Sequence, residues 1–332
     1  MFKVLIYNFY VFISIIGFNQ ITHEKIPLII DADTANELDD LFAIARAVSE
    51  PKFNILAINS AQFNNSPLAT SNSVKESQLL NEKILRILNR KEIILPLGAN
   101  KKLVNYESPQ TSEASELIIR KAHEMKKGEK LNIAILGPCT NVASAIIKDP
   151  SIVRKIRVYY LGIWHNPKTN FYNKKEFNTG NDPIALEILL NSKELDFNLM
   201  SATTSQKLIF LKDEVELNFS NNSSLGSLLI NRWKSFNRWW TKEDPDKKKW
   251  IMWDLALIEA IANPKLAISE TFFTPDENVK REIKIYTLSK TNKSNYNIKI
   301  PEIDISEPLY KLVEYIERSL NHRNNNLTIH VD

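Results

Sequence analysis

Short apolar runs alternate with amphipathic segments along most of the chain, and this alternation restricts the folds that are open to it. The apolar runs have the length and composition of buried strands, and they cover Ile26–Ile30, Phe53–Ala57, Ile93–Leu97, Leu131–Leu136, Ile156–Leu161 and Phe197–Ser201. The segments between them have apolar residues at helical spacing, at Leu41–Ser49, Ser73–Leu88, Ser112–Met125, Asn141–Ile147 and Pro183–Leu190. Strands that alternate with helices pair into parallel sheets. We therefore predict an α/β fold: a single domain with a mainly parallel central sheet, helices on both faces and a Rossmann-like core.

An acidic segment follows the first predicted strand. Four aspartates and a glutamate lie within ten positions there, at Asp31, Asp33, Glu37, Asp39 and Asp40. So many carboxylates at the carboxyl end of a central strand repel one another, and a hard cation such as Ca²⁺ or Mg²⁺ would remove this cost because it prefers oxygen ligands. Ligands of parallel sheets also bind at this end of the strands. The alternative is an ordinary helix whose acidic N-terminus complements its dipole.

The composition excludes several classes of protein. With 43 lysines and arginines against 39 aspartates and glutamates, the net charge is +4, and the basic residues are dispersed except at Lys247–Lys249. A nucleic-acid-binding surface needs clustered basic residues, so we expect no nucleic-acid partner. The 7 glycines form neither a GxGxxG nor a GxxxxGK motif, which excludes the common phosphate-binding loops. Cys139 is the single cysteine, so an intramolecular disulfide and CxxC-type zinc sites are excluded as well.

The N-terminus has the layout of an export signal. Met1–Lys3 is short and basic, Val4–Phe18 is almost wholly apolar, and a polar stretch covers Asn19–Lys25. The apolar run of 15 residues is short for a membrane span, and the order of the three regions is that of a secretory signal. We therefore predict a signal peptide over residues 1–22 and an exported protein, periplasmic or secreted. No clear cleavage site is present, so an uncleaved anchor stays open, and membrane contact is expected only in that case.

A tryptophan-rich segment lies in the C-terminal third of the chain. Five of the six tryptophans fall between Leu225 and Leu257, at Trp233, Trp239, Trp240, Trp250 and Trp253. Charged residues flank them, which favours a helix and loop that reach the surface. Aromatic side chains in such places often line a pocket.

The remainder of the chain reads as β-rich and then helical. Apolar runs at Ile283–Thr287 and Tyr296–Ile300 predict strands, and Leu309–Leu320 predicts a closing helix. No linker divides the chain, so we predict one domain over residues 26–322. A polar tail covers residues 323–332.

Five motifs follow one another along the chain. They are Asp31–Asp40, which fits a longer form of DxDxGxDD with Glu37 in the insertion, Phe63–Asn64 after the second strand, Gly137–Asn141 in the form GPCTN, Asn170 six residues before Glu176–Asn178 and Asp182–Pro183, and Trp253–Ala256 near the start of a late helix. In this order they resemble the inosine-uridine-preferring nucleoside hydrolase family over most of the chain. The resemblance implies the nucleoside hydrolase fold and hydrolysis of the N-glycosidic bond of a small-molecule ribonucleoside. Assembly into a homo-oligomer is left open.

The resemblance implies a Ca²⁺ site as well. Asp33, Asp40 and Asp254 would bind the ion together with the main-chain carbonyl of Leu136. Asp33 would also act as general base toward a metal-bound water. Water and ribose hydroxyls would fill the remaining positions of an ion that takes about six to eight oxygen ligands.

The same resemblance implies contacts with the ribose. Asp39 and Asn178 would fix the 2′ and 3′ hydroxyls. Asn170 and Glu176 would hold the 5′ hydroxyl, and Asn64 would complete the set. Asp31 is expected to orient the acidic loop.

Two departures from the family pattern concern the base and the loops. Trp253 stands where the common form has the histidine that serves the leaving base, and purine-preferring relatives also have tryptophan there. We therefore expect Trp253 to stack on the base and purine nucleosides to be preferred. Protonation of the leaving base is left open between solvent and Tyr106, His165, Trp239 or Trp240. The glycines of the first two motifs are missing, which allows a different loop geometry.

Two other classes of protein stay open. In a haloacid-dehalogenase-like phosphatase, Asp31 would be the nucleophile and Asp33 the acid, beside Mg²⁺. That family also needs a late acidic motif, for which Gly180–Asp182 is a weak candidate, and it leaves Asp39 and Asp40 unexplained. A sugar- or nucleoside-binding protein without catalysis is the other alternative, because motif residues have been lost.

Overall fold

A seven-stranded sheet forms the centre of the molecule in the computed structural model, which describes residues 24–219, 223–265, 267–275 and 279–288. Its strands are β1 (Ile26–Ala32), β2 (Phe53–Ser60), β3 (Leu131–Ile135), β4 (Ile156–Gly162), β7 (Asp196–Ser201), β10 (Ala267–Phe273) and β11 (Glu282–Leu288). The order across the sheet is β10-β11-β7-β4-β3-β1-β2, and every neighbouring pair is parallel except β10 with β11. The predicted mainly parallel sheet is therefore confirmed.

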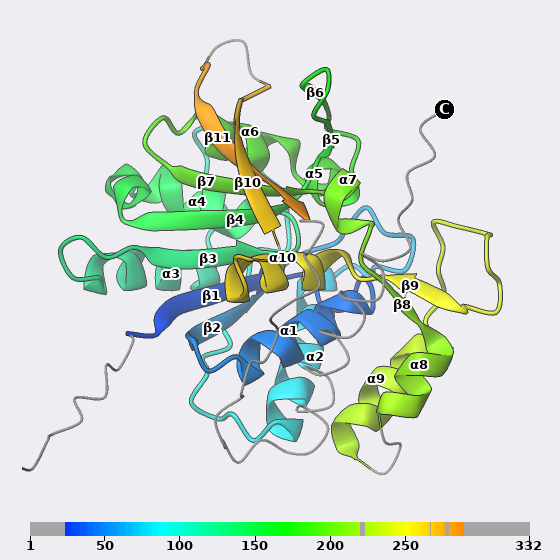
Figure 1. Ribbon diagram of the computed structural model, residues 1–332. Helices are drawn as coiled ribbons and strands as arrows, with labels where there is room; N and C mark the ends of the chain where they lie inside the picture. Colours follow the sequence, from blue (N-terminus) through cyan, green and yellow to red (C-terminus); the bar gives the residue numbers. More distant parts are fainter. Residues whose placement is uncertain (1–23, 220–222, 266, 276–278, 289–332) are drawn as a thin grey trace, which may run out of the picture.

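Two small antiparallel pairs of strands lie outside this sheet. In the first, β5 (Trp164–Asn166) forms a hairpin with β6 (Phe171–Asn173). In the second, β8 (Ile209–Leu211) pairs with β9 (Lys249–Ile251), which joins segments far apart in the sequence. Figure 1 shows the β8–β9 pair beside the helices that follow β8.

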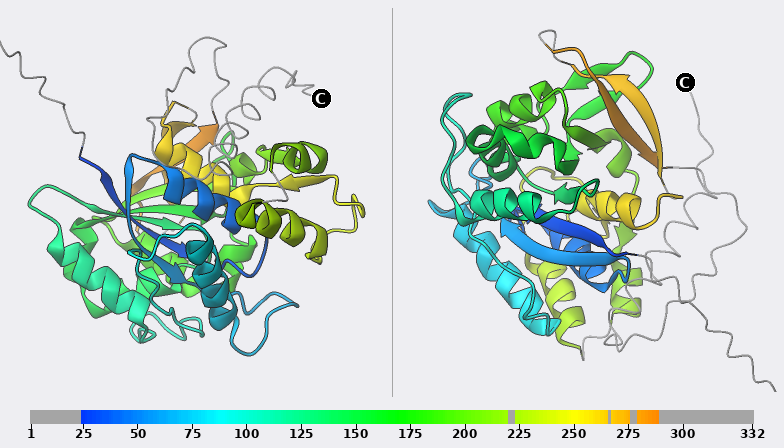
Figure 2. Two further views of the ribbon diagram at one scale, coloured as in Figure 1. Left: turned by 90° about the horizontal axis from the view of Figure 1, so that it is seen from below. Right: turned by 90° about the vertical axis from the view of Figure 1, so that its left-hand side faces the viewer.

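Helices cover both faces of the sheet (Figures 1 and 2). They are α1 (Asp39–Ser49), α2 (Ser73–Ile87), α3 (Glu113–Glu124), α4 (Thr140–Lys148), α5 (Phe177–Asn181), α6 (Pro183–Asn191), α7 (Ala202–Ser205), α8 (Lys212–Asn218), α9 (Ser224–Ser235) and α10 (Trp253–Ala262), with a 3₁₀ helix at Pro150–Arg154. Successive side chains of a strand point to opposite faces. Ile29 of β1 therefore joins the core under α3, α4 and α6, whereas Leu28 and Ile30 join the core under α1 and α10.

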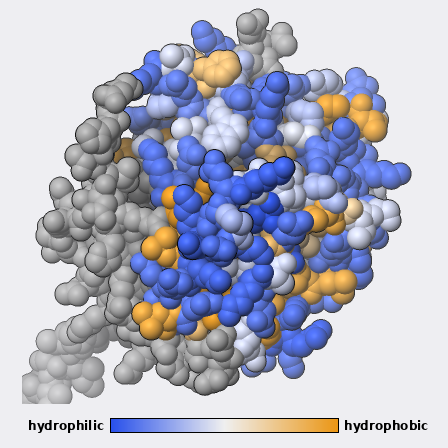
Figure 3. All heavy atoms as spheres, turned by 90° about the vertical axis from the view of Figure 1, so that its right-hand side faces the viewer, coloured by the Kyte–Doolittle hydropathy of each residue, from blue (hydrophilic) through white to orange (hydrophobic). Residues whose placement is uncertain are grey.

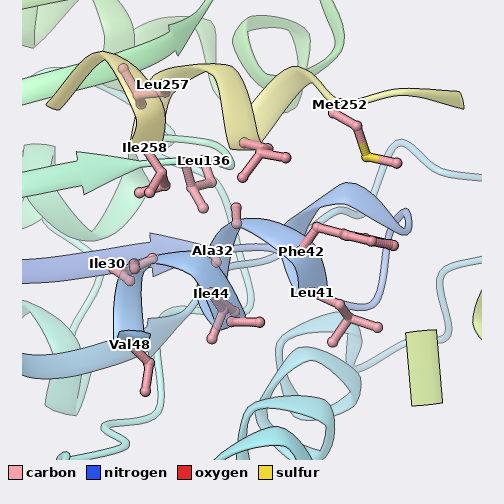
Figure 4. Close-up of a cluster of buried hydrophobic side chains, with 14 of the residues drawn as sticks. Ile30, Ala32, Leu41, Phe42, Ile44, Val48, Leu136, Met252, Leu257 and Ile258 are labelled. Carbon is pink, nitrogen blue, oxygen red and sulfur yellow. The ribbon is translucent and has the colours of Figure 1, made fainter. Parts of the chain in front are cut away.

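The core on one face is built largely by α1 and α10, which lie side by side (Figure 4). Leu41 and Ile44 of α1 and Leu257 and Ile258 of α10 are fully buried there. Every residue of α10 after Trp253 is buried, so this helix is apolar around most of its circumference and packs within the protein on several sides.

One predicted strand does not form. Residues 93–97 make only an isolated parallel bridge, between Ala57 and Ile94, although Ile58 N–H and Ser60 N–H donate to the carbonyls of Ile94 and Pro96. Pro96 has no N–H to donate in return, which prevents a regular ladder along this edge of β2. The prediction of a strand at Ile93–Leu97 was therefore wrong.

The five predicted helices all form, within two residues of their predicted ends. The predicted strand Ile283–Thr287 is part of β11. The predicted signal peptide at 1–22, the strand Tyr296–Ile300, the helix Leu309–Leu320 and the tail at 323–332 lie outside the described residues.

The surface that carries α8, α9 and the β8–β9 pair is largely hydrophilic, with apolar side chains in small separate groups (Figure 3). Leu217 and Leu211 are among the exposed apolar residues of this region. None of the helices in the described part of the chain is long and apolar enough to span a membrane.

Candidate active site

A cavity of about 230 Å³ opens at the carboxyl end of the central strands. Asp33, which directly follows β1, and Leu136, which directly follows β3, both line it. Asp40 from the start of α1 and Asp254 from the start of α10 line it from another side. The cavity therefore lies where parallel sheets place their ligands.

Three carboxyl groups meet at one point of this cavity. Oxygen atoms of Asp39, Asp40 and Asp254 all lie within 4.8 Å of one another, and the three residues are at most 4% exposed. Asp39 also ties the two helices together, because its Oδ2 accepts a hydrogen bond of 3.0 Å from the main-chain N–H of Asp254. The sequence predicted that Asp33, Asp40 and Asp254 would converge. In the structure, Asp39 rather than Asp33 completes the closest group.

Asp33 lines the same cavity beside this group. Its carboxylate packs against Gly137, where a Cβ atom would lie 2.9 Å from Asp33 Oδ1, closer than two such atoms can approach. A glycine at the start of the GPCTN motif is therefore what lets Asp33 occupy its place. Burial, followed by the charges of Asp40 and Asp39, raises the pKa of Asp33 well above its ordinary value.

Several carboxylate oxygens around the cavity have no hydrogen-bond donor among the described residues. Asp33 Oδ2, Asp39 Oδ1 and Asp40 Oδ1 are all buried in this state. Charged oxygens buried without partners are costly. Repulsion adds to the cost: burial and then the neighbouring aspartates raise the pKa of Asp40 and of Asp254. A hard divalent cation would neutralise these atoms, and it prefers donors that are all oxygen, so the residues present fit such an ion.

Without a divalent cation, lowering the pH from about 8 to about 5 is expected to stabilise the protein. Burial raises the pKa of Asp39 to about 6 and that of Asp31 to about 7, from an ordinary value of 3.8. Within this window the folded protein holds protons that the unfolded chain has lost, so stability is lost as the pH rises through it. Melting temperatures in chelator and in Ca²⁺ test this. A cation in the cavity should flatten the part of the pH dependence that Asp39 and its neighbouring carboxyl groups cause, whereas the part due to Asp31, which lies outside the cavity, should remain. Equal slopes with and without Ca²⁺ would show that the cation does not bind in the cavity.

Asp31 lies at the end of β1, at the start of the acidic loop, and is held by two amide groups. It is fully buried, and its carboxylate accepts hydrogen bonds from the amide groups of Asn59 at 2.9 Å and of Asn141 at 3.2 Å. Asn141 belongs to the GPCTN motif and also accepts a hydrogen bond from the Ala99 N–H. Asp31 does not line the cavity, which agrees with its predicted role in orienting the loop.

Two contacts with the same loop could not be predicted from the sequence, one from Arg232, which was not singled out, and one from Trp250, which was named only as part of the tryptophan-rich segment. Arg232 of α9 donates from Nη2 to the carbonyl of Ala35 at 2.6 Å. Trp250 of β9 donates from Nε1 to Glu37 Oε1 at 3.0 Å, and Glu37 lines the cavity. Both contacts join positions about 200 residues apart, so spacing along the sequence could not reveal them.

The EFN segment connects the cavity with the main chain. Glu176 is the N-cap of α5, and its carboxylate accepts hydrogen bonds from the N–H groups of Asn178 at 3.0 Å and Thr179 at 2.9 Å. The Asn178 amide donates to the carbonyls of Leu136 at 2.7 Å and Leu161 at 3.2 Å. A carbonyl oxygen has two lone pairs, so Leu136 can still bind a cation.

Aromatic side chains form two walls of the cavity. Trp253 and Trp164 meet edge to face with their ring centroids 5.8 Å apart. Phe177 packs on Trp239 at 5.6 Å, and Trp240 lies beside Trp239. All five residues line the cavity. The structure thus brings Trp253, Trp239 and Trp240 together, as the sequence predicted.

Trp164 is the clearest omission of the sequence analysis. It directly precedes His165, and alternation along β5 turns the two side chains to opposite sides. His165 packs between Tyr172 and Phe272, at centroid distances of 4.6 and 4.7 Å, and does not line the cavity. The position of Trp164 just after β4, at the carboxyl end of the sheet, was the feature of the sequence that could have identified it as a cavity residue. Lys175 also lines the cavity without having been singled out.

Two predicted substrate contacts lie outside the cavity. Asn64 donates to the Asn100 carbonyl at 2.7 Å and accepts a hydrogen bond from Ser73 at 2.7 Å. Asn170 bonds through Oδ1 to His165 Nε2 at 3.0 Å. Their amide groups are thus engaged with the protein itself, because loop contacts rather than strand ends set their positions.

Tyr106, considered as an acid for the leaving base, also lies elsewhere. It is 54% exposed, bonds to Glu187, and lines a second, shallower depression. With His165 outside the cavity as well, Trp239 and Trp240 are the two side chains considered for this role that do line it.

Comparisons with known proteins show what the sequence resembles. The model of the family described as "Inosine-uridine preferring nucleoside hydrolase" matches residues 28–304. The pyrimidine-specific ribonucleoside hydrolase RihA of Escherichia coli O1:K1 is 30% identical over 190 residues, which cover 50% of this chain and 57% of that protein. The chain thus spans little more than half the length of the curated relatives it matches.

Solved structures share the fold. A purine-preferring ribonucleoside hydrolase from Gardnerella vaginalis superposes with a TM-score of 0.61 at 16% identity, over 89% of this chain and 99% of that one. An inosine-uridine preferring nucleoside hydrolase from Bacillus anthracis gives 0.57 at 14% identity, over 90% and 99%. Because the family model covers most of the sequence and the fold agrees, the chain belongs to the inosine-uridine preferring nucleoside hydrolase family.

Proposed function

We propose that the protein is a Ca²⁺-dependent hydrolase that splits the N-glycosidic bond of ribonucleosides into free base and ribose. One observation carries this proposal. Buried carboxylate oxygens of Asp33, Asp39 and Asp40 have no donor among the described residues, and they line a cavity whose other walls are aromatic. The oxygens fit a divalent cation, and the aromatic walls fit a nucleobase. Asp33 and Asp40 would hold the cation together with Asp254 and the Leu136 carbonyl.

Asp33 is proposed as the general base. Its Oδ2 is free of hydrogen bonds from the described residues, and Gly137 leaves room for it at the cavity wall. When bound, a divalent cation would lower the pKa of a water molecule and offset the negative charge of the surrounding carboxylates. Asp33 takes a proton from water as the water oxygen bonds to C1′ of the sugar. The bond between C1′ and the base nitrogen breaks, and the base leaves with the electron pair and acquires a proton.

Asp39, Asn178 and Glu176 are proposed to bind the sugar. The Glu176 carboxylate accepts hydrogen bonds from two main-chain N–H groups, and these bonds fix its orientation before substrate binds. The 5′ hydroxyl would meet an acceptor that needs no reorganisation, and such contacts favour the transition state when the sugar distorts. The contacts predicted for Asn64 and Asn170 stay predictions, since each would first have to leave its present partners.

The base is proposed to stack on Trp253, with Trp164 and Trp239 as further aromatic contacts. This arrangement favours purines, which offer the larger ring surface. The relatives do not decide the base, since one structural neighbour is named purine-preferring and the relative from Escherichia coli is named pyrimidine-specific. The base preference of this chain therefore rests on its own tryptophans.

Replacing Trp253 with alanine is expected to remove the purine preference. Stacking contributes roughly 1–3 kcal/mol per base in nucleic-acid recognition, so kcat/KM for inosine and guanosine should fall by about tenfold or more, and less for uridine and cytidine. Trp233→Phe is the matched control, because Trp233 is buried outside the cavity. Faster cleavage of uridine by the wild type, or an unchanged profile in Trp253→Ala, would assign Trp253 to core packing.

A substrate panel tests the proposed reaction. Ribonucleosides with Ca²⁺ should release free base and reducing sugar in equal amounts. Ribonucleoside binding without release of base would favour the non-catalytic alternative. Release of phosphate from phosphomonoesters, without free base, would favour a phosphatase.

A further inference from the structure

A cluster of three charged side chains is buried between α1 and α10. Arg46 of α1 donates from Nε to Glu259 of α10 at 2.6 Å, and its Nη2 lies 2.9 Å from Glu50 at the end of α1. The three side chains are only 3–7% exposed. Each charge is therefore largely removed from water, at a considerable cost in solvation.

Stability alone does not account for this cluster. Apolar side chains of similar volume often stabilise a core as well as a buried ion pair does. Most of the interface between the two helices is apolar (Figure 4). Apolar contacts are not directional, so directional bonds contribute most to selecting one register. The bond between Arg46 and Glu259 is directional, and it lies further along the two helices than the bond between Asp39 and the Asp254 N–H.

That register matters for the candidate metal centre. Asp40 lies six residues before Arg46 on α1, and Asp254 lies five residues before Glu259 on α10. A displacement by one helical turn, about 5.4 Å, would separate carboxylate oxygens that now lie within 4.8 Å of one another. Distances between a metal ion and its ligands vary by only about 0.2 Å. Even a small displacement of one helix along the other would therefore weaken metal binding.

We propose that Arg46 and Glu259 are positioning residues, which set the register of α1 and α10 so that Asp40 and Asp254 can hold one divalent cation. This inference rests on the proposed metal centre. Neither residue lines the cavity, so neither touches the ion or the substrate. They act on the metal centre by fixing the position of α1 relative to α10, and so the positions of Asp40 and Asp254.

The test compares Glu259→Leu with Glu259→Gln. Both remove the same charge, but only glutamine keeps an acceptor for Arg46 Nε, and in both the Arg46–Glu50 pair within α1 is retained. Ca²⁺ affinity is measured by calorimetry on protein stripped with chelator, after circular dichroism confirms the fold. We expect Glu259→Leu to weaken Ca²⁺ binding by about 10–100-fold, as for other residues that orient metal ligands. Glu259→Gln should stay close to the wild type.

Arg46→Lys gives a second measurement if Glu259→Leu fails to fold. Lysine keeps the charge but cannot reach both glutamates with a planar fork, so we again expect weaker Ca²⁺ binding. Three outcomes are decisive. Wild-type affinity in Glu259→Leu, or in Arg46→Lys, overturns the inference and leaves the proposed function intact. An equal loss of Ca²⁺ affinity in Glu259→Leu and Glu259→Gln would show that the charge of Glu259 matters rather than its hydrogen bond, and it also overturns the inference. Absence of Ca²⁺ binding by the wild type contradicts the proposed metal centre itself.

Discussion

Asp33→Ala is expected to lower kcat for ribonucleoside hydrolysis by about 10³-fold or more, because proton abstraction and cation binding are lost together. Asp33 is 2% exposed, and its Oδ2 accepts no hydrogen bond from the described residues, which leaves this oxygen able to take a proton. The rate of base release under saturating nucleoside and excess Ca²⁺ is the measurement.

Asp33→Asn separates the two roles of this residue. Asparagine keeps the shape and one oxygen ligand, but it cannot take a proton at neutral pH. We expect a loss of about 10²–10⁴-fold in kcat, as for other general bases, with Ca²⁺ still bound. A rate near that of the wild type would show that another group is the base.

Asp254→Ala is the second substitution with a large expected effect. It removes one of three carboxyl groups whose oxygens lie within 4.8 Å of one another. Burial and then repulsion from Asp39, Asp40 and Asp33 raise the pKa of Asp254. Without a cation, the variant should therefore be at least as stable as the wild type. The increase in melting temperature on adding Ca²⁺ should largely vanish, and activity should fall with it.

The matched control is Asp246→Ala, because Asp246 is exposed on the loop before β9 and, among the described residues, forms an ion pair with Lys248 alone, at 3.6 Å. This variant should keep the wild-type response to Ca²⁺. A full Ca²⁺ response in Asp254→Ala would remove Asp254 from the metal centre.

The parts of the site that lie next to strands and helices could be predicted from the sequence. An apolar run followed by carboxylates and a helical pattern placed Asp33 just after a strand and Asp40 just before a helix, and the structure has them after β1 and at the start of α1. Asp254 was placed by the family resemblance, and the structure has it in the first turn of α10. For Asp33 and Asp40, the position of the side chain follows from regular elements whose periodicity is visible in the sequence.

The parts that depend on loop conformation could not be predicted in this way. Asn64 and Asn170 lie in loops, and contacts with Ser73 and His165 decide where their amide groups point. Trp164 enters the cavity because a short hairpin follows β4. Such contacts join residues that no local pattern connects.

The tryptophan-rich segment was predicted only in part. Trp233 and Trp250 pack into the core, with centroids 5.4 Å apart and at most 2% of each residue exposed. Trp239, Trp240 and Trp253 line the cavity. Composition identifies the whole segment, but the division between core and cavity depends on where α9, β9 and α10 pack.

Titration of chelator-stripped protein with Ca²⁺ tests the central claim most directly, when bound Ca²⁺ and release of base from inosine are measured in the same samples. The account predicts no release of base without the ion and activity that rises in proportion to one bound Ca²⁺ per chain. Full release of base in excess chelator, or saturation of the site with Ca²⁺ without any release of base from purine or pyrimidine nucleosides, would contradict it.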